Sequence, residues 1–205
     1  MVGDGSHDWW HVHRVWRSAQ AIAAGEVAAG REVDLLVVEL AALLHDIADW
    51  KFHDGDEAAG PRAARAFLEG ERVAPETVEH VTDIVARVSF KGAGVPDVMP
   101  TLEGRIVQDA DRLDALGAVG IARTFAYGGH AGRPIHTPGE VAELHDDPAG
   151  YRARGSRASV THFHEKLLLL RERMHTPTAR RIADERHAYM EEFLARFEQE
   201  WDGRA

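Results

Sequence analysis

The feature that most constrains this chain is a histidine–aspartate pair at the end of an almost uniformly apolar segment. Residues 35–44 hold nine apolar side chains and Glu39, and His45 and Asp46 follow directly. A segment that is apolar on nearly every side is typical of a buried helix. An imidazole and a carboxylate are costly to bury unless each has a partner, and one metal cation can serve both. The sequence therefore places the candidate functional site at this pair.

Composition narrows the class of protein. The chain has 205 residues, of which 44% are hydrophobic and 28% charged, and this suits a single soluble domain over 1–205. No stretch approaches the ~20 consecutive apolar residues of a membrane span, and no signal-peptide pattern is present, so we expect a cytoplasmic protein without membrane contact. The formal net charge of −10 argues against binding of duplex nucleic acid. Because the chain has no cysteine, a transition-metal site must use histidine and carboxylate.

The hydrophobic pattern predicts an all-α fold, with glycine and proline at the helix boundaries. Asp34 and Pro75 are well placed as the N-cap and the first residue of two of the helices. We expect helices over residues 8–24, 35–46, 57–68, 75–88, 102–116, 121–127, 160–174 and 178–201. Residues 128–155, rich in Gly, Pro and His, are expected to form a long loop with one helical turn near Val141. Such a loop before two C-terminal helices serves either as a lid or as a surface insertion without function.

A metal site needs ligands beyond the His45–Asp46 pair, and the first predicted helix carries three further histidines. At 100° per residue, His11 lies about 80° from the centre of the apolar face, whereas His7 and His13 lie about 120° from it. His11 is therefore best placed at the edge of the core. Any one histidine among the 13 in the chain is more commonly a surface or packing residue, so the geometry nominates His11 without assigning it a role.

The helix expected over 102–116 offers carboxylates for the same site. Asp114 falls within its apolar face, Asp111 lies at the border of that face, and Asp109 is expected to turn away. Pairing with a neighbouring arginine is an equal alternative to metal ligation for these aspartates. Two imidazoles and two carboxylates suit Mn²⁺, Fe²⁺, Ni²⁺, Co²⁺ or Mg²⁺ better than zinc, because structural zinc prefers four closed nitrogen or sulfur ligands.

Three short motifs, taken in order, carry a family resemblance. They are HVHRV at 11–15, LLHDI at 43–47 and DADRL at 109–113. This set resembles the H…HD…D signature of the HD-domain metal-dependent phosphohydrolases. Further segments resemble one bacterial branch of that family, the nucleoside triphosphate pyrophosphohydrolases, and these segments are 7–11, 45–52, 89–92, 108–117, 166–168 and 190–194. The resemblance spans nearly the whole chain and implies an all-helical HD-domain bundle that hydrolyses nucleotides, usually with Mn²⁺.

Carried over residue by residue, the resemblance implies four metal ligands. These are His11, His45, Asp46 and Asp111. Asp114 is then expected at the substrate site, where it orients a ligand or pairs with Arg112. A bound divalent ion would lower the pKa of a water molecule and polarise a phosphoryl oxygen.

The same chemistry needs cations for the phosphate oxygens and a carboxylate that accepts a proton. Arg14, Lys51 and Lys91 are the candidate cations, because two of the chain's three lysines fall within motif-like segments. Ordinary solvated lysines are the alternative interpretation. The candidate carboxylates, among which the sequence does not choose, are Asp49, Asp54 and Glu57.

These observations predict a metal-dependent enzyme that cleaves (deoxy)nucleoside triphosphates to the monophosphate and pyrophosphate. A 5′-nucleotidase or phosphomonoesterase that uses the same site is one alternative. A non-catalytic module that binds a metal or a nucleotide is the other. The expected partner is a small-molecule nucleotide, and a homodimer is left open.

Overall fold

The computed structural model describes residues 8–48, 56–89, 98–144 and 157–204. Its described residues form helices and irregular segments and contain no strand, which confirms the all-α prediction. They fall into two compact units, one made of 8–89 and 98–111 and the other of 112–204. That the chain acts as one domain over 1–205 stays a prediction. None of the described helices combines the length and the apolar character that crossing a membrane requires.

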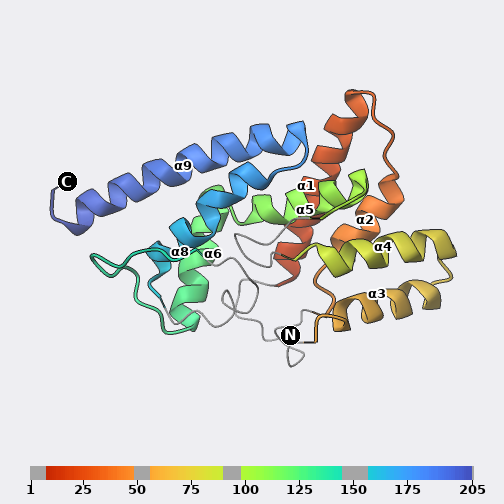
Figure 1. The fold of residues 1–205 in the computed structure, drawn as a ribbon, viewed down its shortest axis with the longest axis horizontal. Coiled ribbons are helices and arrows are strands. Elements are labelled where there is room, and N and C mark those ends of the chain that lie inside the picture. The colour runs from red at the N-terminus through yellow and green to blue at the C-terminus, as the bar shows by residue number, and fades with distance from the viewer. Residues whose placement is uncertain (1–7, 49–55, 90–97, 145–156, 205) are drawn as a thin grey trace. The chain divides into compact units, whose positions relative to one another are not determined.

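The first unit is a layer of packed helices. α1 (Trp9–Ala28) packs against α2 (Leu35–Leu44), α2 against α4 (Pro75–Arg87), and α4 against α3 (Ala59–Gly70) (Figure 1). α5 (Leu102–Asp114) contributes its residues up to 111 to the same unit. Its core consists of apolar residues from these helices, among them Val15, Ile22, Val38, Leu68, Ile84 and Ile106.

Local signals in the sequence set the starts of these helices. The Asp34 carboxylate accepts hydrogen bonds from the backbone N–H groups of Leu36 and Val37, so Asp34 is the N-cap of α2 as predicted. Pro75 opens α4 in the first turn, where its missing N–H costs nothing. α2 is buried along most of its length, but Leu35 and Leu36 at its start are exposed.

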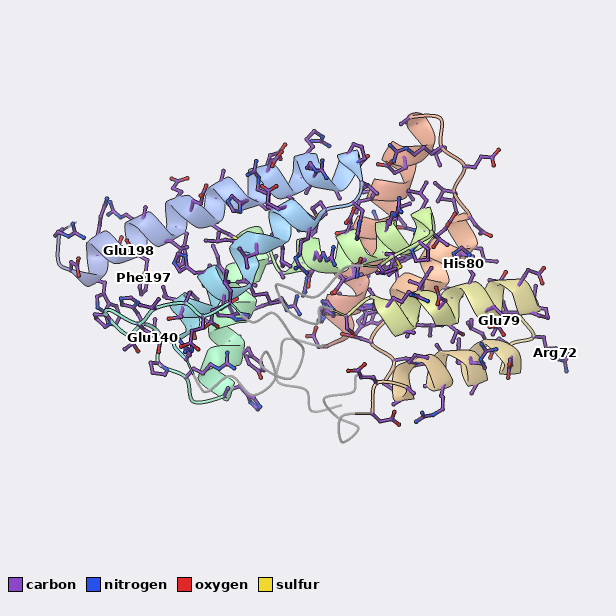
Figure 2. All side chains as sticks on the ribbon, viewed as in Figure 1. Arg72, Glu79, His80, Glu140, Phe197 and Glu198 are labelled. Carbon is purple, nitrogen blue, oxygen red and sulfur yellow. The ribbon has the colours of Figure 1, made fainter. Side chains whose placement is uncertain are left out.

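The described residues of the second unit form four helical elements after the end of α5. They are α6 (Gly117–His130), α8 (Ser159–Glu165), the 3₁₀ helix η2 (Leu167–Arg173) and α9 (Pro177–Trp201). α6 packs against α8 and α9, and η2 packs against α8 and α9. Four phenylalanines from α6, α8 and α9 join the elements with ring centroids 6.0–6.4 Å apart, and they are Phe125, Phe163, Phe193 and Phe197. Figure 2 labels Phe197 near the C-terminal end of α9.

Three expectations about this unit differ from the structure. The single helix expected over 160–174 is divided into α8 and η2, because Lys166 adopts φ −141° and ψ −58°, outside the helical region. The helical turn expected near Val141 is absent, since described residues 137–144 form no helix. α6 is also longer than the expected 121–127, and it begins at Gly117, whose positive φ of 70° glycine tolerates best.

The predicted long loop begins later than expected and is anchored along its described part. Residues 128–130 belong to α6, residues 131–144 follow an irregular path, and 145–155 lie outside the described residues. Backbone N–H groups of Ser159 and Val160 donate to the carbonyls of Pro134 and Ile135 at 2.9 and 3.0 Å. We call residues 131–144 the strap. Whether the loop acts as a lid stays a prediction.

Candidate metal centre

The four side chains predicted as metal ligands converge within the first unit. His11 lies in the first turn of α1, and Asp111 lies on α5. His45 is the C-cap of α2, and Asp46 follows it in the turn. The histidine–aspartate pair therefore lies at the C-terminal end of α2, where His45 keeps the helical backbone angles φ −57° and ψ −33°.

The ligand atoms lie close enough to share one ion. His11 Nε2 is 3.1 Å from His45 Nε2. Asp46 Oδ2 lies 3.4 Å from His11 Nε2 and 3.7 Å from His45 Nε2, and Asp111 Oδ1 lies 3.6 and 3.8 Å from the same two atoms. Ligand atoms about 2.1 Å from an ion are about 3.0 Å apart in an octahedral and about 3.4 Å apart in a tetrahedral arrangement. The donor set therefore fits a divalent metal ion.

One hydrogen bond sets the chemistry of His45. Its Nδ1 lies 2.8 Å from the carbonyl oxygen of Ala42. Because a carbonyl oxygen only accepts, Nδ1 carries the proton, and in the neutral ring Nε2 keeps its lone pair. That lone pair faces the Nε2 of His11, and a cation between the two nitrogens satisfies both rings.

Burial divides the centre into a closed side and an open side. The His11 and His45 residues are only 1% and 6% exposed, whereas the side chains of Asp46 and Asp111 are 21% and 29% exposed. The imidazoles are thus held in the core, and the carboxylates border the solvent. Such a site holds an ion on one side and admits water and substrate on the other.

The remaining predicted residues are distributed as follows. Arg14 lies on α1, one turn beyond His11 and on the same side of the helix, and it is partly buried. Glu57 is exposed in the turn before α3. Asp49, Asp54, Lys51 and Lys91 lie outside the described residues. The catalytic and substrate-binding roles of these residues stay predictions.

Asp114 belongs to the second unit, and it is almost fully buried there. Its Oδ2 accepts a hydrogen bond of 2.7 Å from Nη1 of Arg123 on α6. The arginine partner that the sequence suggested, Arg112, donates from Nη1 to the carbonyl oxygen of Arg173 and faces Nε2 of His175 at 3.2 Å. These contacts join α5 to the elements that follow it. The substrate-binding role of Asp114 stays a prediction.

Sequence reasoning missed how deeply α5 is buried. The expectation that Asp109 turns away is wrong, because residues 106–110 are all buried and Asp109 is fully so. Gln108 is buried as well, and its Nε2 donates to the carbonyl oxygens of Arg87 and Val88 at 3.3 and 3.2 Å. Gln108 thereby satisfies carbonyls at the C-terminal end of α4, which have no partner within that helix. The sequence did carry one sign of this burial, namely a run of polar residues within a segment whose other residues are typical of a buried core.

Comparisons with known proteins agree with this geometry. The HD domain family matches residues 9–116, which include all four candidate ligands. The protein YpgQ of Bacillus subtilis is 37% identical over 198 residues, covering 96% of this chain and 85% of its own.

Solved structures are similar over nearly the whole chain. A protein from Lactobacillus plantarum has a TM-score of 0.82 and 34% identity, covering 97% of this chain and 89% of its own. An HD-superfamily hydrolase from Bacillus thuringiensis has a TM-score of 0.71 and 40% identity, with 96% and 87% covered. YpgQ in complex with ADP has a TM-score of 0.74 and 32% identity, with 99% and 94% covered. The chain therefore belongs to the HD domain family and has the fold of the HD-superfamily hydrolases.

Proposed function

We propose that this protein is a metal-dependent phosphohydrolase that cleaves (deoxy)nucleoside triphosphates to the monophosphate and pyrophosphate. The observation that carries the proposal is the meeting of two buried imidazoles, 3.1 Å apart, with two partly exposed carboxylates that each lie 3.4–3.8 Å from both imidazole nitrogens. Such a donor set on a hydrolase fold suits an ion that is held firmly and yet remains open to water and a phosphate oxygen.

In this proposal each of the four ligands has a distinct role in binding the ion. His11 and His45 hold the ion through Nε2, and the Ala42 carbonyl keeps the ring of His45 in the ligating tautomer. Asp46 and Asp111 supply oxygen ligands at the open side. A bound divalent ion, Mn²⁺ in our proposal, lowers the pKa of a water molecule and withdraws charge from the phosphoryl group.

Further residues are assigned from the sequence and from their place in the chain. Arg14, on the same side of α1 as His11, binds phosphate oxygens, and a guanidinium matches their geometry. Lys51 and Lys91 complete the set of cations. Asp49 or Glu57 accepts the proton of the attacking water. Asp114 contributes to substrate binding through the residues that it holds in place.

The nucleotide class is supported by a relative, since YpgQ has been crystallised in complex with ADP. We extend that class of ligand to this chain because the two proteins are similar over 99% of its length. A bound cation would reduce the repulsion between a triphosphate and the carboxylates of this acidic chain.

The test is a product analysis. Metal-stripped protein is incubated with a panel of nucleoside and deoxynucleoside triphosphates and monophosphates, with and without Mn²⁺, and the products are separated by chromatography. We expect monophosphate and pyrophosphate only when Mn²⁺ is present. Nucleoside and phosphate released from monophosphates would instead favour a 5′-nucleotidase, and no turnover despite tight metal binding would favour a non-catalytic module.

A further inference from the structure

The first turn of α1 is held by the carboxylate of Asp8. Its Oδ1 accepts a hydrogen bond of 3.0 Å from the backbone N–H of His11. The backbone of Asp8 is extended, at φ −105° and ψ 179°, and its carbonyl oxygen accepts from the N–H groups of His11 and Val12. These are the features of a helix N-cap, in which the side chain satisfies an N–H group that has no partner within the helix.

The residues between the cap and His11 contribute little burial to this turn. Trp9 is 58% exposed and Trp10 is 61% exposed. Their ring contacts are with His13 on the same helix, at centroid distances of 6.2 and 5.9 Å. Such contacts stiffen the helix but do not fix it to a neighbour. The Asp8 cap therefore contributes much of the stability of this helical turn.

We propose that Asp8 is a positioning residue for the metal centre. By capping α1 it holds His11 in the helical turn, so that Nε2 of His11 stays 3.1 Å from Nε2 of His45 and 3.4 Å from Oδ2 of Asp46. The inference rests on the proposed role of His11 as a metal ligand. Asp8 acts through the backbone of His11 and not through contact with the ion.

The size of the effect follows from the population of the frayed turn. A ligand that binds only the ordered conformation shows an affinity reduced by the fraction that is ordered. Loss of an N-cap shifts the equilibrium constant between the ordered and the frayed turn by about fivefold, although the size of this shift varies widely among proteins. This shift is the upper limit on the loss of metal affinity.

The experiment compares the dissociation constant of Mn²⁺ among variants of the full chain, measured by electron paramagnetic resonance of free Mn²⁺. Asp8→Ala should weaken binding by up to about fivefold, whereas Asp8→Asn and Asp8→Ser should stay within about twofold of wild type, because Asn and Ser cap as well as Asp. The matched control is Asp34→Ala. It removes the same kind of cap from α2, but at the end of that helix remote from His45.

A second measurement needs no metal. Hydrogen exchange followed by NMR should show that the His11 amide loses protection in Asp8→Ala and keeps it in Asp8→Ser, since this amide is the one that the carboxylate binds. The proposal is overturned if Asp8→Ala binds Mn²⁺ as wild type does, or if Asp8→Asn and Asp8→Ser are as impaired as Asp8→Ala. It is also overturned if Asp34→Ala weakens binding equally, because loss of stability would then explain the result.

The two proposals fail in different ways. A wild-type protein that binds no divalent ion would overturn the metal centre itself and with it the role of Asp8. Tight binding of Mn²⁺ by wild type with no change in Asp8→Ala would leave the metal centre standing and overturn only the inference about Asp8.

Discussion

His45 shows at the scale of one residue how a single hydrogen bond decides what a side chain can do. The carbonyl oxygen of Ala42, one turn earlier in the chain, accepts a hydrogen bond from Nδ1–H, so that the lone pair of Nε2 is left for the metal. The sequence identifies the histidine, but its tautomer depends on how the chain turns after Leu44.

Asp46 provides the sharpest test at this scale. Asp46→Ala should lower the affinity for Mn²⁺ by about 100-fold or more, because loss of a group that merely supports a ligand already costs 10–100-fold. Hydrolysis should fall in parallel, and both are measured on the purified variant by metal titration and product analysis. Asp83→Ala is the control, since Asp83 is an exposed partner of Arg87 on α4. A folded Asp46→Ala protein that keeps full activity would contradict the metal mechanism.

At the scale of elements, one carboxylate, that of Glu140 (labelled in Figure 2), anchors the strap to the start of α8. Its Oε2 accepts hydrogen bonds from the backbone N–H of Ala158 at 3.0 Å and from the hydroxyl of Thr161. The hydrogen bond from Thr161 lowers the pKa of Glu140 below its usual 4.5, and burial opposes that shift. The Ala158 N–H and the charge of Arg157 lower the pKa further.

The lowered pKa makes the anchor sensitive to acid. A carboxylate with a folded pKa below its unfolded value stabilises the fold above about pH 5, and this contribution is lost as the pH falls through the folded pKa. Glu140→Gln should therefore lower the thermal midpoint at pH 7, and the difference from wild type should shrink below about pH 4. Thermal denaturation of both proteins from pH 3 to pH 7 measures this difference in thermal midpoint.

The control for this prediction is Glu143→Gln. Glu143 forms an exposed ion pair with Arg157, and such pairs contribute about 0–1 kcal/mol. A difference between wild type and Glu140→Gln that stays constant across the pH range would show that the charge of Glu140 does not anchor the strap.

The phenylalanine cluster joins α6, α8 and α9, so removing one of its rings should weaken the packing of all three helices. Phe163 is fully buried and lies 6.0 Å from Phe125 and 6.2 Å from Phe193 between ring centroids. Phe163→Ala should lower the free energy of unfolding by about 3–5 kcal/mol, measured by urea denaturation, because it leaves a cavity. Tyr189→Ala on the exposed side of α9 should change it by less than about 0.5 kcal/mol. Equal effects of the two variants would contradict this account of the core.

Helix boundaries could be predicted where a local signal sets them. Asp34 and Pro75 act through their own turn, and each lies at a helix start in the structure. The break at Lys166 has no such signal, because neither proline nor glycine stands within residues 159–173. After the break, η2 packs against both α8 and α9.

At the scale of the whole molecule, the ligands come from α1, α5 and the turn after α2, so a bound ion should link these elements. A ligand that binds only the folded state at 100 times its dissociation constant stabilises that state by about 2.7 kcal/mol. For a chain of this length, the thermal midpoint should rise by about 5–10 °C when Mn²⁺ is added to metal-stripped protein. Differential scanning fluorimetry measures the shift, and EDTA should reverse it.

Asp46→Ala is again the informative variant, because it lacks one of the proposed ligands. Its thermal midpoint should respond to Mn²⁺ much less than that of wild type. An equal rise in both proteins would mean that the ion acts elsewhere on this acidic chain, whose formal net charge is −10.

The sequence by itself determined the all-α class, most helix starts and four residues with the chemistry of metal ligands. The fold class and the helix starts follow from side-chain periodicity and capping residues, whereas the four ligands follow from the resemblance of three short motifs to a known family. Tertiary structure alone decided that the two imidazole nitrogens lie 3.1 Å apart and 3.4–3.8 Å from the two carboxylates, that Asp109 is buried, and that Asp114 pairs with Arg123. Such relations join residues that are distant in the chain or faces that packing covers, and helical periodicity describes only one helix at a time.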